Sequence, residues 1–347
     1  MLIEKYRPRT FDEIIGQDYA KIVIKSLIEK YRSGEIKVLP NMLFYGPPGT
    51  GKTSMAHVIA HELKIPIVEY NASKERGVSF VENTLAPLSK TKGKRIIFLD
   101  EADHMSPQAQ AMLRRILEES AMIAVKTNGS DMNVFILSAN YYWRIIEPIR
   151  SRCVQIPFSK IPFEQMVDRL VSIVEKEGIK WENENEFELL AQAIEIIVNE
   201  AEGDMRKALN ILEKIIISTK GRKLTPEVVR TTLEPEIPNM LFKIIYEGDF
   251  FTAVRELEDA IILNKIVPQM FLDRFLKIII AFTEANKDKL DFESMKKLLI
   301  VVDKISSAEH TLIIGGSPLI QLTGVLAVLW TALHSIPNKK QLILRGA

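Results

Sequence analysis

The chain has 347 residues and a net charge of +1 at pH 7, from 46 Lys and Arg against 45 Asp and Glu. With 47% hydrophobic and 26% charged residues, it has the composition of a globular protein, which excludes collagen-like, disordered and disulfide-scaffold classes. The balanced charge excludes a uniformly basic nucleic-acid binder, and the length predicts two or three domains.

Two features bear on the cellular compartment. The single cysteine, Cys153, permits no intrachain disulfide, and the first nine residues lack an apolar run of signal-peptide length, so we expect an intracellular protein.

From 310 to 338 no residue carries a charge, a stretch long enough to cross a bilayer. Because Gly315-Gly316-Ser317-Pro318 interrupts it, we expect no membrane span but a helix buried in a core or subunit interface.

The first 160 residues alternate short apolar runs with segments of helical length. Polar residues, Gly or Pro bound each run, and this pattern predicts an α/β fold with a mostly parallel sheet covered by helices. A ligand is then expected at the carboxyl ends of the strands. The positive charge of the chain also lies here, with 23 Lys and Arg against 17 Asp and Glu. The predicted strands are 41–45, 66–70, 95–99 and 133–137.

After residue 158 the sequence becomes helical. Segments 165–176, 186–200 and 204–218 have apolar residues at helical spacing, and a Pro-containing cluster at 234–238 separates them from a third block that is also helical. The net charge is −4 over 161–230 and −1 over 231–347. We therefore expect three domains, 1–161, 162–233 and 234–347.

A phosphate-binding motif follows the first predicted strand. The segment Gly46-Pro47-Pro48-Gly49-Thr50-Gly51-Lys52-Thr53 matches G-x-x-x-x-G-K-[ST] and precedes a predicted helix over 54–63, which is the context the motif requires. Its glycines allow backbone N–H groups to converge on the β- and γ-phosphates of a nucleotide. Lys52 adds a positive charge, and the Thr53 hydroxyl is a ligand for Mg²⁺.

Acidic and amide side chains follow two further strands. Asp100 and Glu101 end the strand at 95–99, so Asp100 is expected to hold Mg²⁺ through water and Glu101 to polarise an attacking water as general base. Asn140 follows the strand at 133–137 and would lie beside Asp100, where it could orient that water. A strand-end Asn is also common as a simple turn residue.

Together these motifs resemble the AAA+ ATPases and, within them, the small subunits of replication factor C, the sliding-clamp loader of archaea and eukaryotes. The resemblance covers nearly the whole chain, and the Ser-Arg-Cys triplet at 151–153 is its most specific element. Besides the phosphate loop, the matching segments are 4–8, 11–17, 71–77, 100–103, 137–141, 145–153 and 202–210.

The resemblance implies roles for individual residues. Asn140 would be the first sensor, Arg206 a second sensor on a helical lid, and Arg152 an arginine finger acting in trans on a neighbouring subunit's nucleotide. With Glu101 and Lys52, these form the implied catalytic set, and Thr53 and Asp100 form the metal site. The implied nucleotide-binding set is Ile3, Tyr6, Arg7, Pro8, Ile15, Gly46, Pro47, Pro48, Gly49, Thr50, Gly51, Lys52, Thr53, Ser54, Asn140 and Arg206.

The resemblance also implies a function. The three domains would be an AAA+ nucleotide-binding domain, a helical lid and a helical collar that joins subunits into a ring. With ATP and Mg²⁺, a pentamer of the replication factor C large subunit and small subunits would load the sliding clamp onto primer–template DNA, in an archaeal cytoplasm or a eukaryotic nucleus. The alternatives are a branch-migration remodeller, which would carry a C-terminal winged helix, and a scaffold subunit that does not hydrolyse ATP.

Some segments depart from the family pattern. The helix after Gly77 has Glu82, Thr84 and Ala86 where basic residues toward DNA are expected, and Lys74 replaces an Asp. Segment 121–132 is expected to be a loop with Asn128-Gly129 at its tip. The aromatic run 141–143 could stack on a base, but packing near Asn140 is favoured. The candidate DNA-binding residues that remain are Arg76, Arg114 and Arg115, with the basic run 90–95.

Overall fold

The computed structural model describes residues 1–179, 181–219, 224–232, 237–263, 266–337 and 342. The chain forms two compact units, residues 1–230 and residues 231–347. The boundary expected between 233 and 234 lies outside the described residues. The first unit contains the sheet and the helices expected in the lid, and the second contains the helices expected in the collar.

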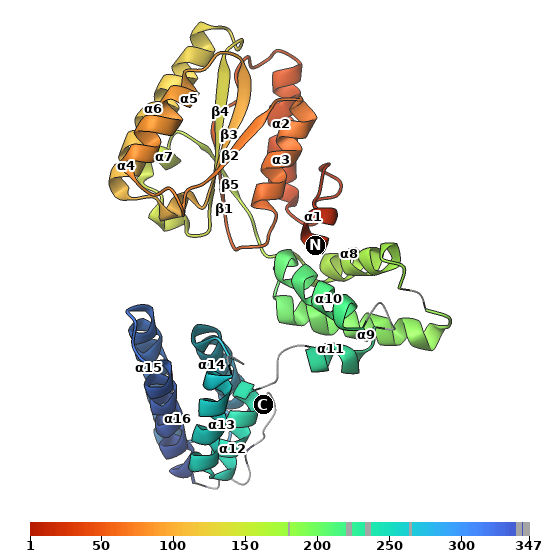
Figure 1. The fold of residues 1–347 in the computed structure, drawn as a ribbon, viewed down its shortest axis with the longest axis vertical. Helices are drawn as coiled ribbons and strands as arrows, with labels where there is room; N and C mark the ends of the chain where they lie inside the picture. The colour runs from red at the N-terminus through yellow and green to blue at the C-terminus, as the bar shows by residue number, and fades with distance from the viewer. Residues whose placement is uncertain (180, 220–223, 233–236, 264–265, 338–341, 343–347) are drawn as a thin grey trace. The chain divides into compact units, whose positions relative to one another are not determined.

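The first unit is built on a five-stranded parallel sheet, which confirms the predicted α/β class (Figure 1). The strand order is β2-β3-β4-β1-β5, so β4 is the central strand and β1 lies between β4 and β5. The register pairs Leu99 with Leu137 and Tyr45 with Ala139, so β1, β3 and β4 end at the same edge. The strands are β1 (Met42–Tyr45), β2 (Ile67–Asn71), β3 (Lys94–Asp100), β4 (Met132–Ala139) and β5 (Val154–Pro157).

Helices cover both faces of this sheet, which explains the continuous apolar runs at 96–99 in β3 and 134–137 in β4. Side chains alternate between faces along a strand. Phe44 and Ile136 therefore pack under α2 (Asp18–Arg32) and α3 (Lys52–Leu63), whereas Leu43 and Phe135 belong to a second core on the opposite side. The helices on that side are α4 (Val78–Phe80), η1 (Val81–Leu85), α5 (Ala86–Ser89), α6 (Pro107–Lys126) and α7 (Glu147–Arg150) (Figure 1).

The expectation of a loop over 121–132 is wrong for residues 121–126, which are helical. Helix α6 continues to Lys126, because Ala124 on its inner face is buried and extends the apolar stripe. The helix ends where Asn128 and Gly129 adopt left-handed backbone angles, with φ of 53° and 78°. Only residues 127–131 connect α6 to β4.

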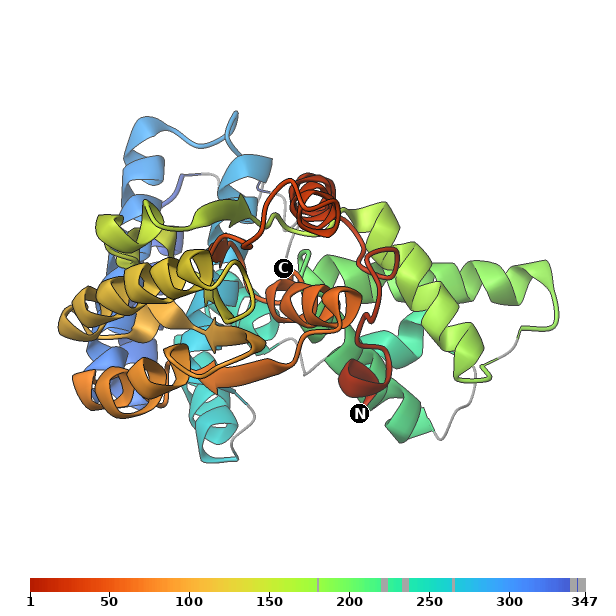
Figure 2. The ribbon, with the colours of Figure 1, turned by 90° about the horizontal axis from the view of Figure 1, so that it is seen from above.

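Four helices of the chain correspond to the expected lid and are called the lid here: α8 (Phe163–Lys176), α9 (Glu184–Ala201), α10 (Met205–Thr219) and α11 (Pro226–Thr232). The N-terminal helix α1 (Leu2–Lys5) lies against α10 (Figures 1 and 2). The Leu2 amide donates to Glu213 at 3.0 Å, and Lys5 Nζ and the Tyr6 hydroxyl both donate to Glu177, at 2.7 and 2.5 Å. These contacts fasten the N-terminal segment to the lid.

In its described residues the second unit has helices and no strand: α12 (Ile237–Glu247), α13 (Phe250–Ile262), α14 (Pro268–Ala285), α15 (Phe292–Ile313) and α16 (Pro318–His334). The uncharged α16 places Leu322, Leu326 and Leu329 in the core of this unit, where no charge is tolerated. No helix in the described part of the chain has the length and apolarity needed to cross a membrane.

The tight turn after α6 makes a stability prediction. A Cβ at Gly129 would lie 2.3 Å from the Lys37 carbonyl oxygen, at a φ that disfavours L side chains. Gly34 has nearly the same φ, 80°, but nothing within 4 Å. In urea unfolding we expect Gly34→Ala to lower the free energy of unfolding by about 1 kcal/mol and Gly129→Ala by about 2 to 4 kcal/mol. Equal losses would contradict the close approach at Gly129.

Candidate nucleotide-binding site

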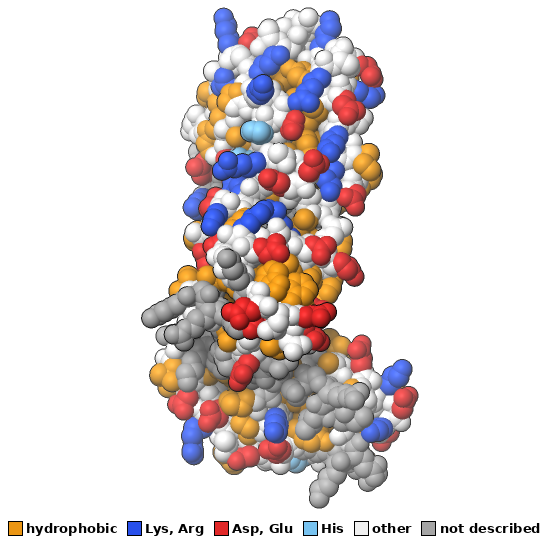
Figure 3. Space-filling view, turned by 90° about the vertical axis from the view of Figure 1, so that its right-hand side faces the viewer, with side chains coloured by type: hydrophobic (Ala, Val, Ile, Leu, Met, Phe, Trp, Pro, Cys, Tyr) orange, Lys and Arg blue, Asp and Glu red, His pale blue; other side chains and the backbone are white. Residues whose placement is uncertain are grey.

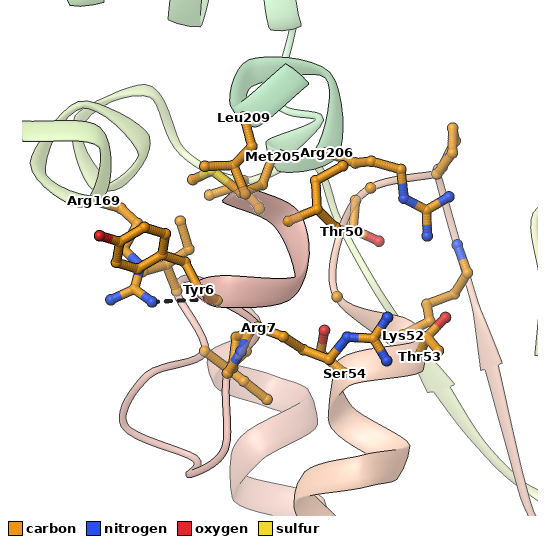
Figure 4. Close-up of a pocket in the computed structure, with 18 of the residues that line it drawn as sticks. Tyr6, Arg7, Thr50, Lys52, Thr53, Ser54, Arg169, Met205, Arg206 and Leu209 are labelled. Carbon is orange, nitrogen blue, oxygen red and sulfur yellow. Dashed lines mark hydrogen bonds between the residues drawn. The ribbon is translucent and has the colours of Figure 1, made fainter. Parts of the chain in front are cut away.

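A cavity of about 180 Å³ opens where the sheet edge, the N-terminal segment and the lid meet. Figure 4 shows Lys52, Thr53 and Ser54 on one side of it and Met205, Arg206 and Leu209 on the other. Its walls are Ile3, Tyr6, Arg7, Pro8, Glu13, Ile14, Ile15, Pro48, Gly49, Thr50, Gly51, Lys52, Thr53, Ser54, Asp100, Glu101, Asn140, Ile161, Arg169, Ile173, Met205, Arg206 and Leu209.

The phosphate loop connects β1 to α3 and has a shape that requires glycine. Gly46 and Gly49 have positive φ, and a Cβ would lie 2.0 Å from the Phe158 carbonyl oxygen at Gly46 and 1.7 Å from an Asp204 carboxylate oxygen at Gly49. The Gly46 amide donates to Ala139 of β4 at 3.1 Å, which fixes the start of the loop. The loop leads into the N-terminus of α3, whose free N–H groups and dipole attract anions.

Lys52 is buried, and its ammonium group joins two parts of the site. Its Nζ donates to the Gly46 and Pro47 carbonyl oxygens, both at 2.7 Å, and to Asn140 Oδ1 at 2.9 Å. Gly46 and Pro47 do not line the cavity, but their carbonyls hold this lysine. Burial lowers the pKa of Lys52 to about 8, against the opposing effect of Asp100 and Asp103. Phosphate oxygens would give this ammonium a stronger partner than neutral carbonyls do.

Oxygen atoms suited to Mg²⁺ converge beside the loop. The Thr53 hydroxyl donates to Asp100 Oδ2 at 3.1 Å, and the Ser138 hydroxyl donates to the other carboxylate oxygen of Asp100. A carboxylate and a hydroxyl are the hard oxygen donors that Mg²⁺ prefers, so these residues fit the metal. Glu101 lines the cavity next to Asp100, and its amide donates to Ser138 Oγ at 3.1 Å.

The lid and N-terminal segment supply walls that the sequence motifs did not reveal. Arg169 of α8 donates to the Tyr6 carbonyl oxygen at 3.3 Å, shown dashed in Figure 4. The Met205 amide of α10 donates to the Gly49 carbonyl at 3.2 Å, so the lid touches the phosphate loop. The lining residues missed by sequence reasoning are Glu13, Ile14, Ile161, Arg169, Ile173, Met205 and Leu209.

Arg152 does not line the cavity of its own chain. Its guanidinium pairs with Glu118 of α6 and donates to the Pro148 carbonyl at 2.7 Å, and its side chain is 34% exposed. Thus the structure brings together all the predicted catalytic and metal residues except this arginine.

The three candidate DNA-binding arginines also lie away from the cavity. Arg76 and Arg115 are exposed, and Arg114 is half-buried with a Nε that has no hydrogen-bond partner.

The aromatic run after Asn140 differs from the packing expected for it. Tyr142 does pack, with its ring centroid 4.5 Å from that of Tyr45 and its hydroxyl donating to Gln155. Tyr141 and Trp143, however, are 43% and 73% exposed. Packing was the wrong interpretation for these two because the turn alternates its side chains between core and solvent.

The comparisons with known proteins agree with this site. Residues 42–160 match the family model described as ATPase family associated with various cellular activities (AAA). The Holliday junction branch migration motor RuvB of Thermotoga maritima superposes with a TM-score of 0.55 at 20% identity, over 73% of this chain and 85% of RuvB, and shares the fold.

Sequence relatives are closer. The replication factor C small subunit of Archaeoglobus fulgidus is 35% identical over 95% of this chain and 97% of its own length. Small subunit 1 of Pyrobaculum arsenaticum is 36% identical over 86% and 87%, and the Methanothermobacter thermautotrophicus small subunit 32% over 94% and 96%. The chain therefore belongs to the replication factor C small subunits, the clamp-loader branch of the AAA+ ATPases.

Proposed function

We propose that this ATPase works inside a heteropentameric ring, with the replication factor C large subunit and other small subunits, to open a sliding clamp and load it onto primer–template DNA. The observation that carries the proposal is the single pocket in which the phosphate loop, Asp100, Glu101 and Asn140 meet under the lid. This pocket has the groups with which one chain can bind Mg²⁺–ATP and activate water, and an arginine finger would come from a neighbouring subunit, so a purely structural ring subunit is disfavoured.

Each residue of the pocket has its own role in this proposal. Thr53 and Asp100 would hold Mg²⁺, which neutralises charge that develops on the phosphates. Lys52 moves from its loop carbonyls to the phosphates and thereby leaves Asn140 free to orient water. Glu101 accepts a proton from that water as general base. Arg206 on α10 adds positive charge from the lid side.

The apolar end of the pocket suits the nucleobase. Ile3 and Ile15 face it from the N-terminal segment, and Ile173 and Leu209 face it from the lid. Apolar walls with a few placed polar groups are typical of ligand sites. We assign adenine to this end, so nucleotide binding would draw the lid and the N-terminal segment together.

We assign residues 1–161 to the AAA+ domain, 162–233 to the lid and 234–347 to the collar. The helical second unit supports a collar and not a winged helix, since its described residues form no strand. This disfavours the branch-migration alternative. The similarity with RuvB is a similarity of fold alone and does not support that function.

DNA contact by this subunit would be local. On the face that carries α2 and α3, Lys and Arg side chains are mixed with Asp and Glu (upper part of Figure 3). Several of these charges are paired, including Lys30 with Glu35 at 2.8 Å and Arg32 with Glu62 at 3.1 Å. A duplex would require a continuous basic surface. We therefore keep Arg76, Arg114 and Arg115, on the other face of the sheet, as the candidates for contact with primer–template DNA.

The general-base role makes the first prediction for this function. Glu101→Gln removes the proton acceptor but keeps the shape of the pocket, so turnover should fall about 100-fold or more while ATP affinity stays within a few-fold. Phosphate release and nucleotide titration, with large subunit, clamp and primed DNA present or absent, measure both. Glu75→Gln, an exposed acid outside the pocket, is the matched control.

The same measurements on the wild type test clamp loading itself. If clamp and DNA leave wild-type turnover unchanged in every combination, clamp loading is rejected.

The trans role of Arg152 makes a second prediction. Because this side chain does not line its own chain's pocket, Arg152→Ala should leave the ATP affinity of the isolated subunit unchanged. In the assembled ring it should lower turnover by about 10³-fold or more, as loss of an arginine finger does. Weaker nucleotide binding by the isolated variant would argue against action in trans.

The buried lysine makes a third prediction. With a pKa of about 8, Lys52 is charged at pH 7 and loses its proton as the pH rises through 8. Bound phosphates favour the charged form, so ATP affinity should fall above pH 8, by up to about tenfold per pH unit. Isothermal titration between pH 7 and 9 tests this. Lys52→Arg keeps its charge, so whatever affinity it retains should not fall over that range.

A further inference from the structure

The turn that follows Asn140 carries an exposed aromatic and cationic cluster that the nucleotide pocket does not use. The ring centroids of Tyr141 and Trp143 lie 5.3 Å apart, with the rings inclined at 56°. The Arg144 guanidinium lies 4.7 Å from the centroid of the Tyr141 ring. We call these three residues the aromatic platform. Because water disfavours an apolar ring as large as Trp143, which is 73% exposed, the platform has the character of a contact surface.

Buried side chains hold this platform from below. The Tyr141 amide donates to Asp103 Oδ2 at 3.0 Å, and the Arg144 carbonyl accepts from Gln110 Nε2 at 3.0 Å. Asp103 and Gln110 are 4% and 2% exposed, so the backbone at both ends of the platform is fixed to the core. A surface held in place in this way loses little conformational entropy when a partner binds.

The charge around the platform selects the kind of partner. Besides Arg144, residues 141–152 contain Arg150, whose guanidinium lies 4.7 Å from the centroid of the Tyr142 ring, and a single acid, Glu147, while the charge of Arg152 is paired with Glu118. A partner should therefore be anionic and should present flat π faces to the rings. Unpaired bases on a phosphate backbone have both properties, whereas the bases of a duplex are already stacked on one another.

We propose that the aromatic platform binds single-stranded nucleic acid, with unpaired bases stacking on Trp143 and Tyr141 while Arg144 contacts a phosphate. Binding at the platform requires neither the ring nor ATP hydrolysis, so its test is independent of the test of clamp loading.

The test is a titration of the full chain, at low salt, into fluorescein-labelled oligothymidylate of about 20 nucleotides and into a duplex of equal length. We expect tighter binding of the single strand and quenching of tryptophan fluorescence. Trp143→Ala should weaken single-strand binding by about 5- to 100-fold and remove most of the quenching. Arg144→Ala should weaken it less. Both side chains are exposed, so the variants should keep the melting temperature of the wild type.

Phe251→Ala serves as the matched control, because Phe251 is an 81% exposed aromatic of the second unit. It should bind like the wild type. Three outcomes would overturn the proposal: no single-strand binding by the wild type, equal affinity for strand and duplex, or unchanged binding by Trp143→Ala. If Trp143→Ala instead weakens association with other subunits and spares oligonucleotide binding, the platform is a subunit contact and the proposal is wrong.

Discussion

The parallel register of β1, β3 and β4 is the constraint on which the rest of the site depends. Parallel strands end at one edge, and here that edge collects the phosphate loop, Asp100 and Asn140 from positions far apart in the sequence. The ammonium of Lys52 joins the two sides of this edge through the Gly46 carbonyl and the Asn140 amide. The apolar cores on both faces of the sheet hold the strands in this register, so the chemistry depends on packing that is remote from the reacting groups.

The other half of the pocket is held differently. The N-terminal segment reaches the lid through Glu177, whose pKa is lowered by hydrogen bonds from Lys5 and Tyr6. Exposed ion pairs of this kind contribute about 0.2 to 1 kcal/mol each, far less than the burial of the sheet core. The contacts that join the N-terminal segment to the lid are therefore weaker than the packing that holds the catalytic edge. A pocket that must admit and release a nucleotide needs one side that is held more weakly than the other.

The sequence was most informative where a pattern repeats or a motif has a fixed spacing. The alternating runs predicted the sheet, and the phosphate-loop motif predicted Lys52 and Thr53, because both signals are local. Arg169 was missed because its contact with Tyr6 joins residues 163 positions apart, and an isolated arginine in a helix has no local signal. The end of α6 was predicted wrongly because Asn128-Gly129 indicates a turn but does not indicate how far the preceding helix extends. Similarly, an aromatic run does not reveal which of its rings face solvent, since that depends on how a turn is fixed to the core.

The residues around Asn140 connect the nucleotide pocket to the aromatic platform. The side chain of Asn140 accepts from Lys52, and the amide of the next residue, Tyr141, donates to the buried carboxylate of Asp103. The other oxygen of that carboxylate is buried without a hydrogen-bond partner, so losing the bond to Tyr141 would leave both oxygens unsatisfied. When phosphates draw Lys52 away from Asn140, the change occurs one residue from the platform and on the same rigid turn. The two surfaces therefore share one turn of the chain, and the same buried contacts that fix the platform also fix the end of the strand that carries Asn140.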